Sequence, residues 1–159
     1  MKRILFVCLG NICRSPIAQG VADNLAKMQT LPLHIDSAGT SRSHEGEAPC
    51  INSIKIASKY GIDISQQYSR PIQTEDIGSF DYVVAMDRQN KKDLEAFGFE
   101  NVYLLGDFGT FDGADVPDPY YFNGLEGFEK VFDMIHVCVE NFLTHAMSKN
   151  TKKGVENGK

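Results

Sequence analysis

The sequence lacks an excess of basic residues and has no basic cluster. Its 16 lysines and arginines are outnumbered by 21 aspartates and glutamates, which gives a formal net charge of −5 at pH 7. Proteins that bind nucleic acid generally gain affinity by neutralising phosphates with lysine and arginine. The composition therefore excludes a general nucleic-acid binder, and any site for an anion has to be local.

Long apolar runs are absent as well. Met1-Lys2-Arg3 is followed by only a few apolar residues, whereas a membrane span needs about 20 and a signal peptide needs a longer apolar stretch. We therefore predict a cytoplasmic protein with no membrane span. In that compartment its four cysteines would stay reduced.

No internal repeat or linker divides the chain. Its 159 residues fit one domain that is large enough to bury most of its apolar surface without disulfides or metals. We predict a single domain over residues 1–147. The polar segment 148–159 has no apolar periodicity and is predicted to be a disordered tail.

The sequence also lacks the motifs of metal and nucleotide sites. Cys8 and Cys13 could supply half of a zinc site, but no second pair of ligands has suitable spacing, because the histidines are scattered at positions 34, 44, 136 and 145. The pattern Gly-x-x-x-x-Gly-Lys-Ser/Thr of nucleotide-binding loops is missing. We expect neither a metal nor a cofactor.

What the chain does have is an alternation of strand and helix patterns. Apolar or alternating segments at 4–7, 33–36, 82–86 and 102–105 predict four strands. Apolar residues recur every three or four positions in segments that predict helices, namely 17–25, 51–60 and 125–142, and Asp87 is a candidate cap for another helix over 89–97. This order predicts an α/β fold with a parallel sheet of four strands and helices on both faces.

A tight loop joins the first strand to the first helix, and residues 8–16 read Cys-Leu-Gly-Asn-Ile-Cys-Arg-Ser-Pro. Ser15 is a good N-cap and Pro16 suits the first helical position, so several backbone N–H groups would lack helical partners near the positive end of the helix dipole. Gly10 lets the backbone approach a ligand closely, and Asn11 tolerates left-handed backbone angles. The loop therefore suits a tetrahedral oxyanion.

Three side chains of this loop predict its chemistry. Arg14 carries a planar guanidinium that can hold two oxygens of a phosphate, and the positive potential around Cys8 favours the thiolate, which is the nucleophilic form. Ser15 can donate a hydrogen bond to that thiolate. Considered alone, Cys8 is explained as a small buried apolar residue at a strand end. The combination with Arg14 at a strand-to-helix junction is much more specific and predicts a nucleophile.

The segment from Cys8 to Pro16 resembles the phosphate-binding loop of the low-molecular-weight protein tyrosine phosphatases. Three further segments resemble motifs of that family in order and spacing: Ser37-Ala38-Gly39-Thr40, Asp81-Tyr82 through Ala85-Met86-Asp87, and Asp118-Pro119-Tyr120-Tyr121. The resemblance implies a three-layer α/β sandwich and a phosphatase acting on phosphotyrosine and other aryl phosphate monoesters. A tyrosine-phosphorylated protein or a small aryl phosphate would be the substrate, and inorganic phosphate would be a product.

The resemblance also implies roles for individual residues. Cys8 would attack phosphorus to form a cysteinyl-phosphate, and Asp118 would protonate the leaving phenol and then activate water. From spacing alone, Asp118 would be assigned to an ordinary surface turn. Tyr120 and Tyr121 would form an aromatic wall beside the substrate ring. The loop that holds the phosphate with Arg14 would consist of Leu9, Gly10, Asn11, Ile12 and Cys13.

The cysteines outside Cys8 and two residues of the loop after the second strand need separate comment. Cys13 is either a small packing residue or, as the resemblance implies, a resolving thiol that forms a disulfide with Cys8 after oxidation. Cys50 and Cys138 lie in helical segments and are predicted to be plain core or surface residues. Ser43 stands where the family commonly carries an aromatic residue, so part of the apolar slot for an aryl ring is missing. The adjacent His44 could substitute, although the pattern favours a solvated loop histidine.

Two other functions fit parts of the sequence. A thioredoxin-coupled arsenate reductase resembles this family in its loop, but it needs two further cysteines past the third strand, and the chain has none between Cys50 and Cys138. A phosphotyrosine-binding module without catalysis would bind phosphate without turnover, yet every catalytic group of the resemblance is present.

Overall fold

The structure is a computed structural model of the chain. It describes residues 1–109, 112–119 and 124–157, and the side chains of these residues as far as Ser148. Tyr120 and Tyr121, which are predicted to form the aromatic wall, lie outside the described residues.

The strands of the described residues form one parallel sheet with the order β2-β1-β3-β4. The strands are β1 (Lys2–Cys8), β2 (Leu33–Gly39), β3 (Tyr82–Ala85) and β4 (Val102–Leu104). Strand β1 pairs with β2 on one side and with β3 on the other, which explains why its run from Ile4 to Val7 is entirely apolar and fully buried. The predicted four-stranded parallel sheet is confirmed.

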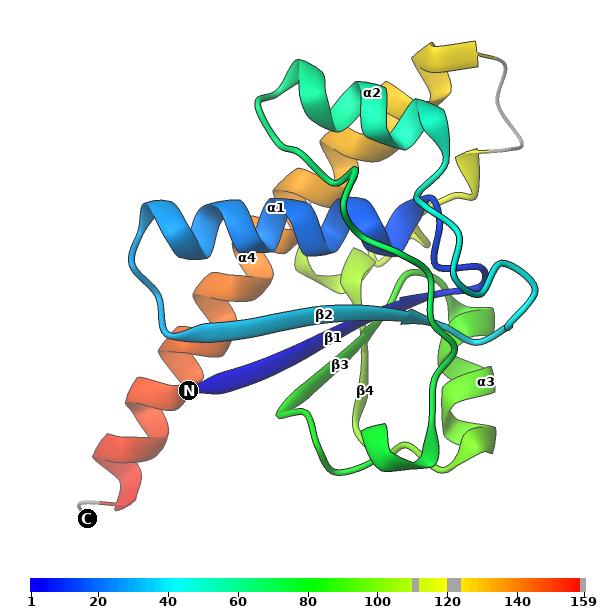
Figure 1. Cartoon of the computed structure of the whole chain (residues 1–159). Helices are drawn as coiled ribbons and strands as arrows, with labels where there is room; N and C mark the ends of the chain where they lie inside the picture. Colours follow the sequence, from blue (N-terminus) through cyan, green and yellow to red (C-terminus); the bar gives the residue numbers. More distant parts are fainter. Residues whose placement is uncertain (110–111, 120–123, 158–159) are drawn as a thin grey trace.

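Helices cover both faces of the sheet, as Figure 1 shows. The helices are α1 (Arg14–Met28), α2 (Ile51–Lys59), α3 (Arg88–Phe97) and α4 (Gly124–Asn157), with short 3-10 turns η1 (Thr74–Asp76) and η2 (Leu105–Phe108). Side chains alternate across β1. Ile4 and Phe6 join the larger core with α1, α2 and α4, while Leu5 and Val7 join a smaller core with Leu94 of α3. This is the predicted three-layer sandwich.

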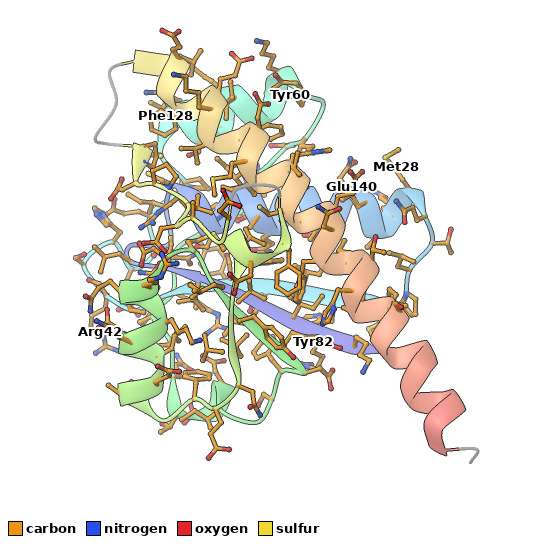
Figure 2. All side chains as sticks on the ribbon, turned by 180° about the vertical axis from the view of Figure 1, so that it is seen from behind. Met28, Arg42, Tyr60, Tyr82, Phe128 and Glu140 are labelled. Carbon is orange, nitrogen blue, oxygen red and sulfur yellow. The ribbon has the colours of Figure 1, made fainter. Side chains whose placement is uncertain are left out.

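Helix α4 supplies much of the larger core. Phe142 packs edge-on against Phe6, with ring centroids 6.3 Å apart, and against Tyr82 at 5.4 Å. Figure 2 shows α4 running diagonally across this face, with Phe128 near its start and Glu140 further along. The aromatic residues of this helix are therefore core, as predicted. Within the described residues, no helix is long and apolar enough to cross a bilayer.

Two predicted helix boundaries differ from the structure. Ser15 is not the N-cap of α1, because the helix starts at Arg14 and Cys13 occupies the cap position. The serine hydroxyl is instead engaged within the loop that precedes the helix. In contrast, Asp87 caps α3 as predicted, since its carboxylate accepts a hydrogen bond from Asn90 N–H. The backbone of α4 continues as helix to Asn157, where the sequence pattern predicts a disordered tail from residue 148; disorder of that segment in solution stays a prediction.

The fold brings the carboxyl ends of the strands to one edge of the sheet. Cys8, the last residue of β1, pairs with Gly39, the last residue of β2. A Cβ atom at Gly39 would lie 2.8 Å from the carbonyl oxygen of Leu9, so only glycine lets the loop after β1 pack this closely. The loop after Cys8 therefore sits in the crevice where α/β proteins bind ligands.

Candidate active site

The carbonyl groups of the loop that follows β1 accept hydrogen bonds from segments outside the loop. Five of the six carbonyls between residues 8 and 13 accept hydrogen bonds from other segments: Cys8 O from Thr40 N (3.0 Å), Leu9 O from Ser41 N (2.9 Å), Gly10 O from Ser69 Oγ (2.9 Å), Ile12 O from Cys50 N (2.8 Å) and Cys13 O from Ser53 Oγ (3.1 Å). In a trans peptide the N–H group points opposite to the C=O group. The next residue's amide therefore turns toward the inside of the loop in each case, and these are the amides of Leu9, Gly10, Asn11, Cys13 and Arg14.

Cys8 lies at the start of this loop. Its side chain is buried, and its Sγ accepts a hydrogen bond from Asn11 N–H at 3.3 Å. The amino end of the 15-residue helix α1 adds its positive dipole on the same side. The hydrogen bond from Asn11 and the helix dipole therefore both reach the sulfur from the side that the sequence predicts, and the role of Cys8 as a nucleophile stays a prediction.

Asn11 holds the loop in shape. Its backbone is left-handed, with φ of 56°. Its Oδ1 accepts from Arg70 N–H at 3.0 Å, and its Nδ2 donates to Ser15 Oγ at 2.7 Å and to Ser37 Oγ at 3.0 Å. A backbone N–H can only donate, so the contact with Arg70 fixes which atom of the Asn11 amide is the oxygen.

The orientation of Asn11 determines the direction of the bond between Ser15 and Cys8. Ser15 Oγ lies 3.0 Å from Cys8 Sγ. Because this oxygen already accepts a hydrogen bond from Asn11, its own proton is available for the sulfur. Ser37 likewise accepts from Asn11 and donates its own proton to Gln19 Oε1 at 2.6 Å. The predicted hydrogen bond from Ser15 to Cys8 is thus built into a network of fixed direction.

Arg14 is a buried cation that is held from one side. Its Nη1 donates to Asp87 Oδ2 at 2.7 Å and to the Val116 carbonyl at 3.0 Å. Burial alone would lower the pKa of Arg14, but the negative charges of Cys8 and Asp87 outweigh burial and raise its pKa. These contacts engage Nη1, and Arg14 also lines the cavity beside Cys8. A guanidinium in that position is suited to a bidentate contact with an oxyanion.

A cavity of about 180 Å³ adjoins Cys8. Its lining combines loop residues with side chains from two distant segments, and consists of Cys8, Leu9, Gly10, Ile12, Cys13, Arg14, Ser43, His44 and Asp118. The structure thus brings Asp118, which is 110 positions away in sequence, to the same cavity as Cys8. Asn11 and Ser15 are not among the residues that line the cavity, and they contact it through their hydrogen bonds to Cys8 Sγ.

The loop after β2 forms another wall of this cavity. His44 lies against the loop, since a Cβ atom at Gly10 would be 3.0 Å from His44 Cδ2. The His44 ring is also held by Glu47, with Nδ1 3.2 Å from Oε1. His44 is therefore a wall residue and not simply a solvated histidine, while Ser43 beside it offers a hydroxyl where an aromatic ring is expected.

Cys50 has a position that the sequence does not suggest. Its Sγ lies 2.6 Å from Cys13 Sγ, at the point where the ends of α1 and α2 meet. Cys138, by contrast, is fully buried in α4, and burial raises its pKa to about 11. The prediction of a plain core residue is confirmed for Cys138, but it is wrong for Cys50.

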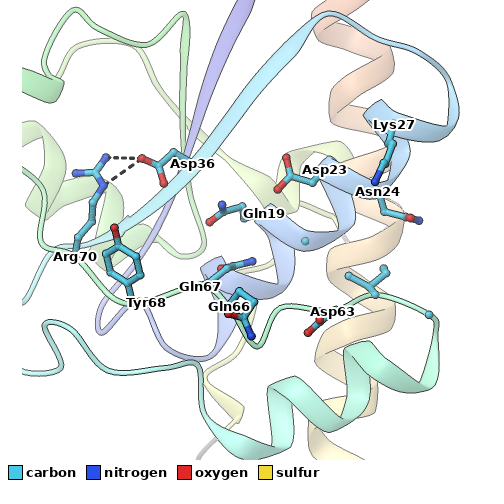
Figure 3. Close-up of a pocket in the computed structure, with 13 residues that line it drawn as sticks. Gln19, Asp23, Asn24, Lys27, Asp36, Asp63, Gln66, Gln67, Tyr68 and Arg70 are labelled. Atoms are coloured by element: carbon cyan, nitrogen blue, oxygen red, sulfur yellow. Dashed lines mark hydrogen bonds and ion pairs between the residues drawn. The ribbon is translucent and has the colours of Figure 1, made fainter.

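A larger cavity of about 610 Å³ lies along α1, beside the segment 61–70 (Figure 3). Its wall contains Asp36, which forms an ion pair with Arg70 at 3.0 Å, and also Asp23 and Asp63. Burial, with the nearby charge of Asp36, raises the pKa of Asp23 to about 6. This cavity is larger, but no cysteine is among the residues that line it, so the smaller cavity beside Cys8 is the candidate active site.

A family model described as low molecular weight phosphotyrosine protein phosphatase matches residues 3–153. The chain belongs to this family. The low molecular weight protein-tyrosine-phosphatase YfkJ of Bacillus subtilis is 38% identical over 150 residues, which cover 90% of this chain and 94% of that protein. These matches confirm the predicted family and the predicted enzyme class, a protein-tyrosine-phosphatase.

Solved structures give the same result for the fold of this phosphatase. A protein tyrosine phosphatase from Entamoeba histolytica, with Hepes in its active site, superposes with a TM-score of 0.87 at 34% identity and covers 94% of this chain and 99% of that chain. The Drosophila arginine phosphatase DARP superposes with a TM-score of 0.82 at 30% identity and covers 92% and 98%. The fold is therefore shared by relatives whose names state different phosphorylated residues.

Sequence reasoning missed several supporting residues of the site. Asp87 is predicted as a helix cap and belongs to a segment that carries the resemblance, but its contact with Arg14, 73 positions away, is not predicted. Ser37 lies in a segment that carries the resemblance, and that segment was the available signal for its contact with Asn11. Nothing in the local sequence indicates Gln19, Arg70 or the Val116 carbonyl.

Proposed function

We propose that this phosphatase hydrolyses aryl phosphate monoesters, phosphotyrosine above all, with Cys8 as the nucleophile. The observation that carries the proposal is the convergence on Cys8 Sγ of a backbone N–H from Asn11 and a hydroxyl from Ser15, at the base of a cavity that Arg14 and Asp118 also line. This arrangement stabilises a sulfur anion and provides donors for a phosphate at the same place.

In the first step, the phosphate oxygens accept hydrogen bonds from the inward-facing amides of the loop and from the guanidinium of Arg14. Cys8 Sγ attacks phosphorus in line as the bond from phosphorus to the phenol oxygen breaks, and Asp118 donates its proton to that oxygen. The loop amides hold the three equatorial oxygens throughout and do not have to reorganise, because their carbonyls are fixed from outside.

In the second step, Asp118 accepts a proton from a water molecule that attacks the cysteinyl-phosphate. Inorganic phosphate forms and the Cys8 thiolate leaves, stabilised by Ser15 and by the amide of Asn11. Both steps use only the loop amides and the side chains of Cys8, Arg14, Ser15 and Asp118. Tyr120 and Tyr121 remain the proposed aromatic wall.

The partners follow from this chemistry. The substrate is a tyrosine-phosphorylated protein or a small aryl phosphate, and the acidic net charge of −5 gives no support to a nucleic-acid substrate. A thiolate nucleophile works only when reduced, so we place the enzyme in the cytoplasm.

Hydrolysis of an aryl phosphate by two variants tests the proposal. Cys8→Ser is expected to abolish turnover while vanadate or phosphate still binds, because the loop amides and Arg14 remain. Asp118→Ala is expected to slow hydrolysis by about 10²- to 10⁴-fold when the leaving group is a poor one, and much less with a good leaving group that needs no proton.

Cys138→Ala is the matched control, because it removes a thiol remote from the cavity and should leave turnover intact. Full activity in Cys8→Ser would remove the nucleophile from the proposal, and an unchanged rate in Asp118→Ala with a poor leaving group would remove the general acid. Parallel assays with phosphotyrosine, phosphoserine and phosphoarginine peptides test the substrate class; preference for phosphoarginine would contradict the aryl specificity.

A further inference from the structure

Two thiols meet beside the active-site cavity. Cys13 Sγ and Cys50 Sγ are 2.6 Å apart, although the residues are 37 positions apart in sequence. Neither residue is part of a disulfide in the structure. A disulfide bond is about 2.0 Å long, so a movement of less than about 1 Å would allow the sulfurs to bond.

Hydrogen bonds hold the two cysteines together independently of their side chains. Cys50 N–H donates to the carbonyl of Ile12 at 2.8 Å, and Ser53 Oγ donates to the carbonyl of Cys13 at 3.1 Å. The start of α2 is therefore fixed to the loop immediately beside Cys13. The sulfurs remain neighbours because the backbones that carry them are bonded together.

The two sulfurs differ in their access to solvent and in reactivity. Cys13 is buried, whereas Cys50 is half-buried. The hydrogen bond with the Cys13 thiol lowers the pKa of Cys50 to about 7, and hydrogen bonds with Ser53 act in the same direction. Burial opposes this shift but is outweighed. Cys50 is also the N-cap residue of the nine-residue helix α2, where the helix dipole favours an anion. Cys50 is thus the more exposed thiol of the pair and the one whose surroundings favour the thiolate.

We propose that Cys13 and Cys50 form a reversible disulfide under a hydroperoxide, a redox site separate from the nucleophile Cys8. The Cys50 thiolate attacks one oxygen of hydrogen peroxide, the O–O bond breaks, and Cys50 sulfenic acid and hydroxide form. Cys13 sulfur then attacks the Cys50 sulfur, the S–O bond breaks, and a second hydroxide leaves. The two thiols lose two electrons and two protons in total, and the peroxide becomes two molecules of water.

This site determines what Cys13 can do for Cys8. A sulfur takes part in only one disulfide, so Cys13 bonded to Cys50 cannot bond to Cys8, although Cys8 and Cys13 line the same cavity. The disulfide therefore leaves Cys8 as a free thiol and ties the end of its loop to α2. A thiol reductant restores both cysteines by exchange.

Peptide mapping of the peroxide-treated full-length protein tests the proposal without relying on activity. Trypsin places Cys8 and Cys13 together in residues 4–14 and Cys50 in residues 43–55. Limited peroxide followed by alkylation is expected to give these two peptides joined, with a mass lower by two hydrogen atoms, and dithiothreitol should separate them. The joined species should persist in Cys8→Ser and in Cys138→Ala.

The same species should be lost in Cys13→Ser and in Cys50→Ser. Cys50→Ser is the decisive variant, because serine is a good N-cap residue and the substitution lies outside the phosphate loop, so the variant should fold and keep its basal turnover. A disulfide confined to peptide 4–14, with Cys50 still open to alkylation, would overturn the proposal. So would a cross-link that survives in Cys13→Ser but disappears in Cys8→Ser.

Discussion

Asn11 illustrates how much of the active site depends on one side chain. It carries a left-handed backbone with φ of 56° and bonds to Ser15, Ser37 and the backbone of Arg70, yet it does not line the cavity. Its contribution has two parts that can be separated by substitution. One is the tolerance of its backbone angles, and the other is the fixed direction of the hydroxyl that Ser15 presents to Cys8.

We expect Asn11→Ala to lose both contributions and to reduce the free energy of unfolding by about 2–4 kcal/mol, since it strains the backbone and leaves buried partners unpaired. Asn11→Gly should lose only the hydrogen bonds and be about 1 kcal/mol more stable than Asn11→Ala. Both variants should hydrolyse aryl phosphate more slowly than the wild type. Urea unfolding of the pair checks this; equal stability of the two variants would show that the backbone conformation costs nothing.

At the scale of elements, Asp87 joins a helix to the active site. One carboxylate oxygen caps α3 through Asn90 N–H at 2.7 Å, and the other binds Arg14 at 2.7 Å. The start of α3 is thereby connected to the start of α1 across the carboxyl edge of the sheet. The position of the Arg14 guanidinium thus depends on the end of a helix on the opposite face of the sheet.

Asp87→Asn should keep the helix cap and remove the ion pair, because an amide oxygen still accepts from Asn90 while its NH₂ group faces Arg14. We expect a loss of stability of about 1–3 kcal/mol and a higher KM for aryl phosphate. Asp87→Ala should lose about 1 kcal/mol more, which is the value of the cap. Thermal unfolding and steady-state kinetics measure both effects, and an Asp87→Asn variant with unchanged KM would mean that Arg14 needs no support from α3.

The elements were the most predictable part of the molecule. The run from Ile4 to Val7 is apolar because the strand is buried on both faces, and the periodicity of α4 is strong because one face of the helix is core, so local sequence predicts both. Contacts between distant positions leave no local pattern. The pairs Arg14–Asp87 and Cys13–Cys50 arise only when the strand ends and helix ends meet at one edge.

The start of α1 shows a different reason for a wrong prediction. Serine before proline is a typical helix start, so the local pattern placed the N-cap at Ser15. In the structure the Ser15 hydroxyl is hydrogen-bonded to Cys8 Sγ instead, and the helix begins one residue earlier, at Arg14. The functional loop takes the side chain that the local rule assigns to the cap, which is where such rules are expected to fail.

At the scale of the whole molecule, the polar cavity in Figure 3 makes stability depend on pH. In the folded protein, desolvation of the carboxylate and then the charge of Asp36 raise the pKa of Asp23 to about 6, although the residue as a whole is exposed. In an unfolded chain the pKa of an aspartate is about 3.9. The folded state therefore binds more protons than the unfolded state between about pH 4 and pH 6. Stability falls as the pH rises through this window.

Asp23→Asn is expected to match the wild type below about pH 4 and to be more stable above about pH 6. The gain should stay below about 1 kcal/mol, because the side chain keeps contact with solvent. Asp63→Asn is the control on the same cavity wall: hydrogen bonds from Ser65 lower the pKa of Asp63, so this variant should lose stability at neutral pH. Chemical unfolding from pH 4 to pH 7 provides the test, and equal stability of Asp23→Asn and wild type at pH 7 would contradict it.

In the proposed mechanism, the phosphoryl group is transferred first to Cys8 Sγ and then to water. The most direct measurement is the mass of peptide 4–14 after rapid acid quenching of Asp118→Ala during turnover of an aryl phosphate with a good leaving group. The first step then needs no proton, while hydrolysis of the intermediate lacks its base. We predict one added phosphoryl group on this peptide, located at Cys8 and absent from Cys8→Ser. Release of the phenol with no phosphorylated peptide at any quench time, or a phosphoryl group on another residue, would contradict the account.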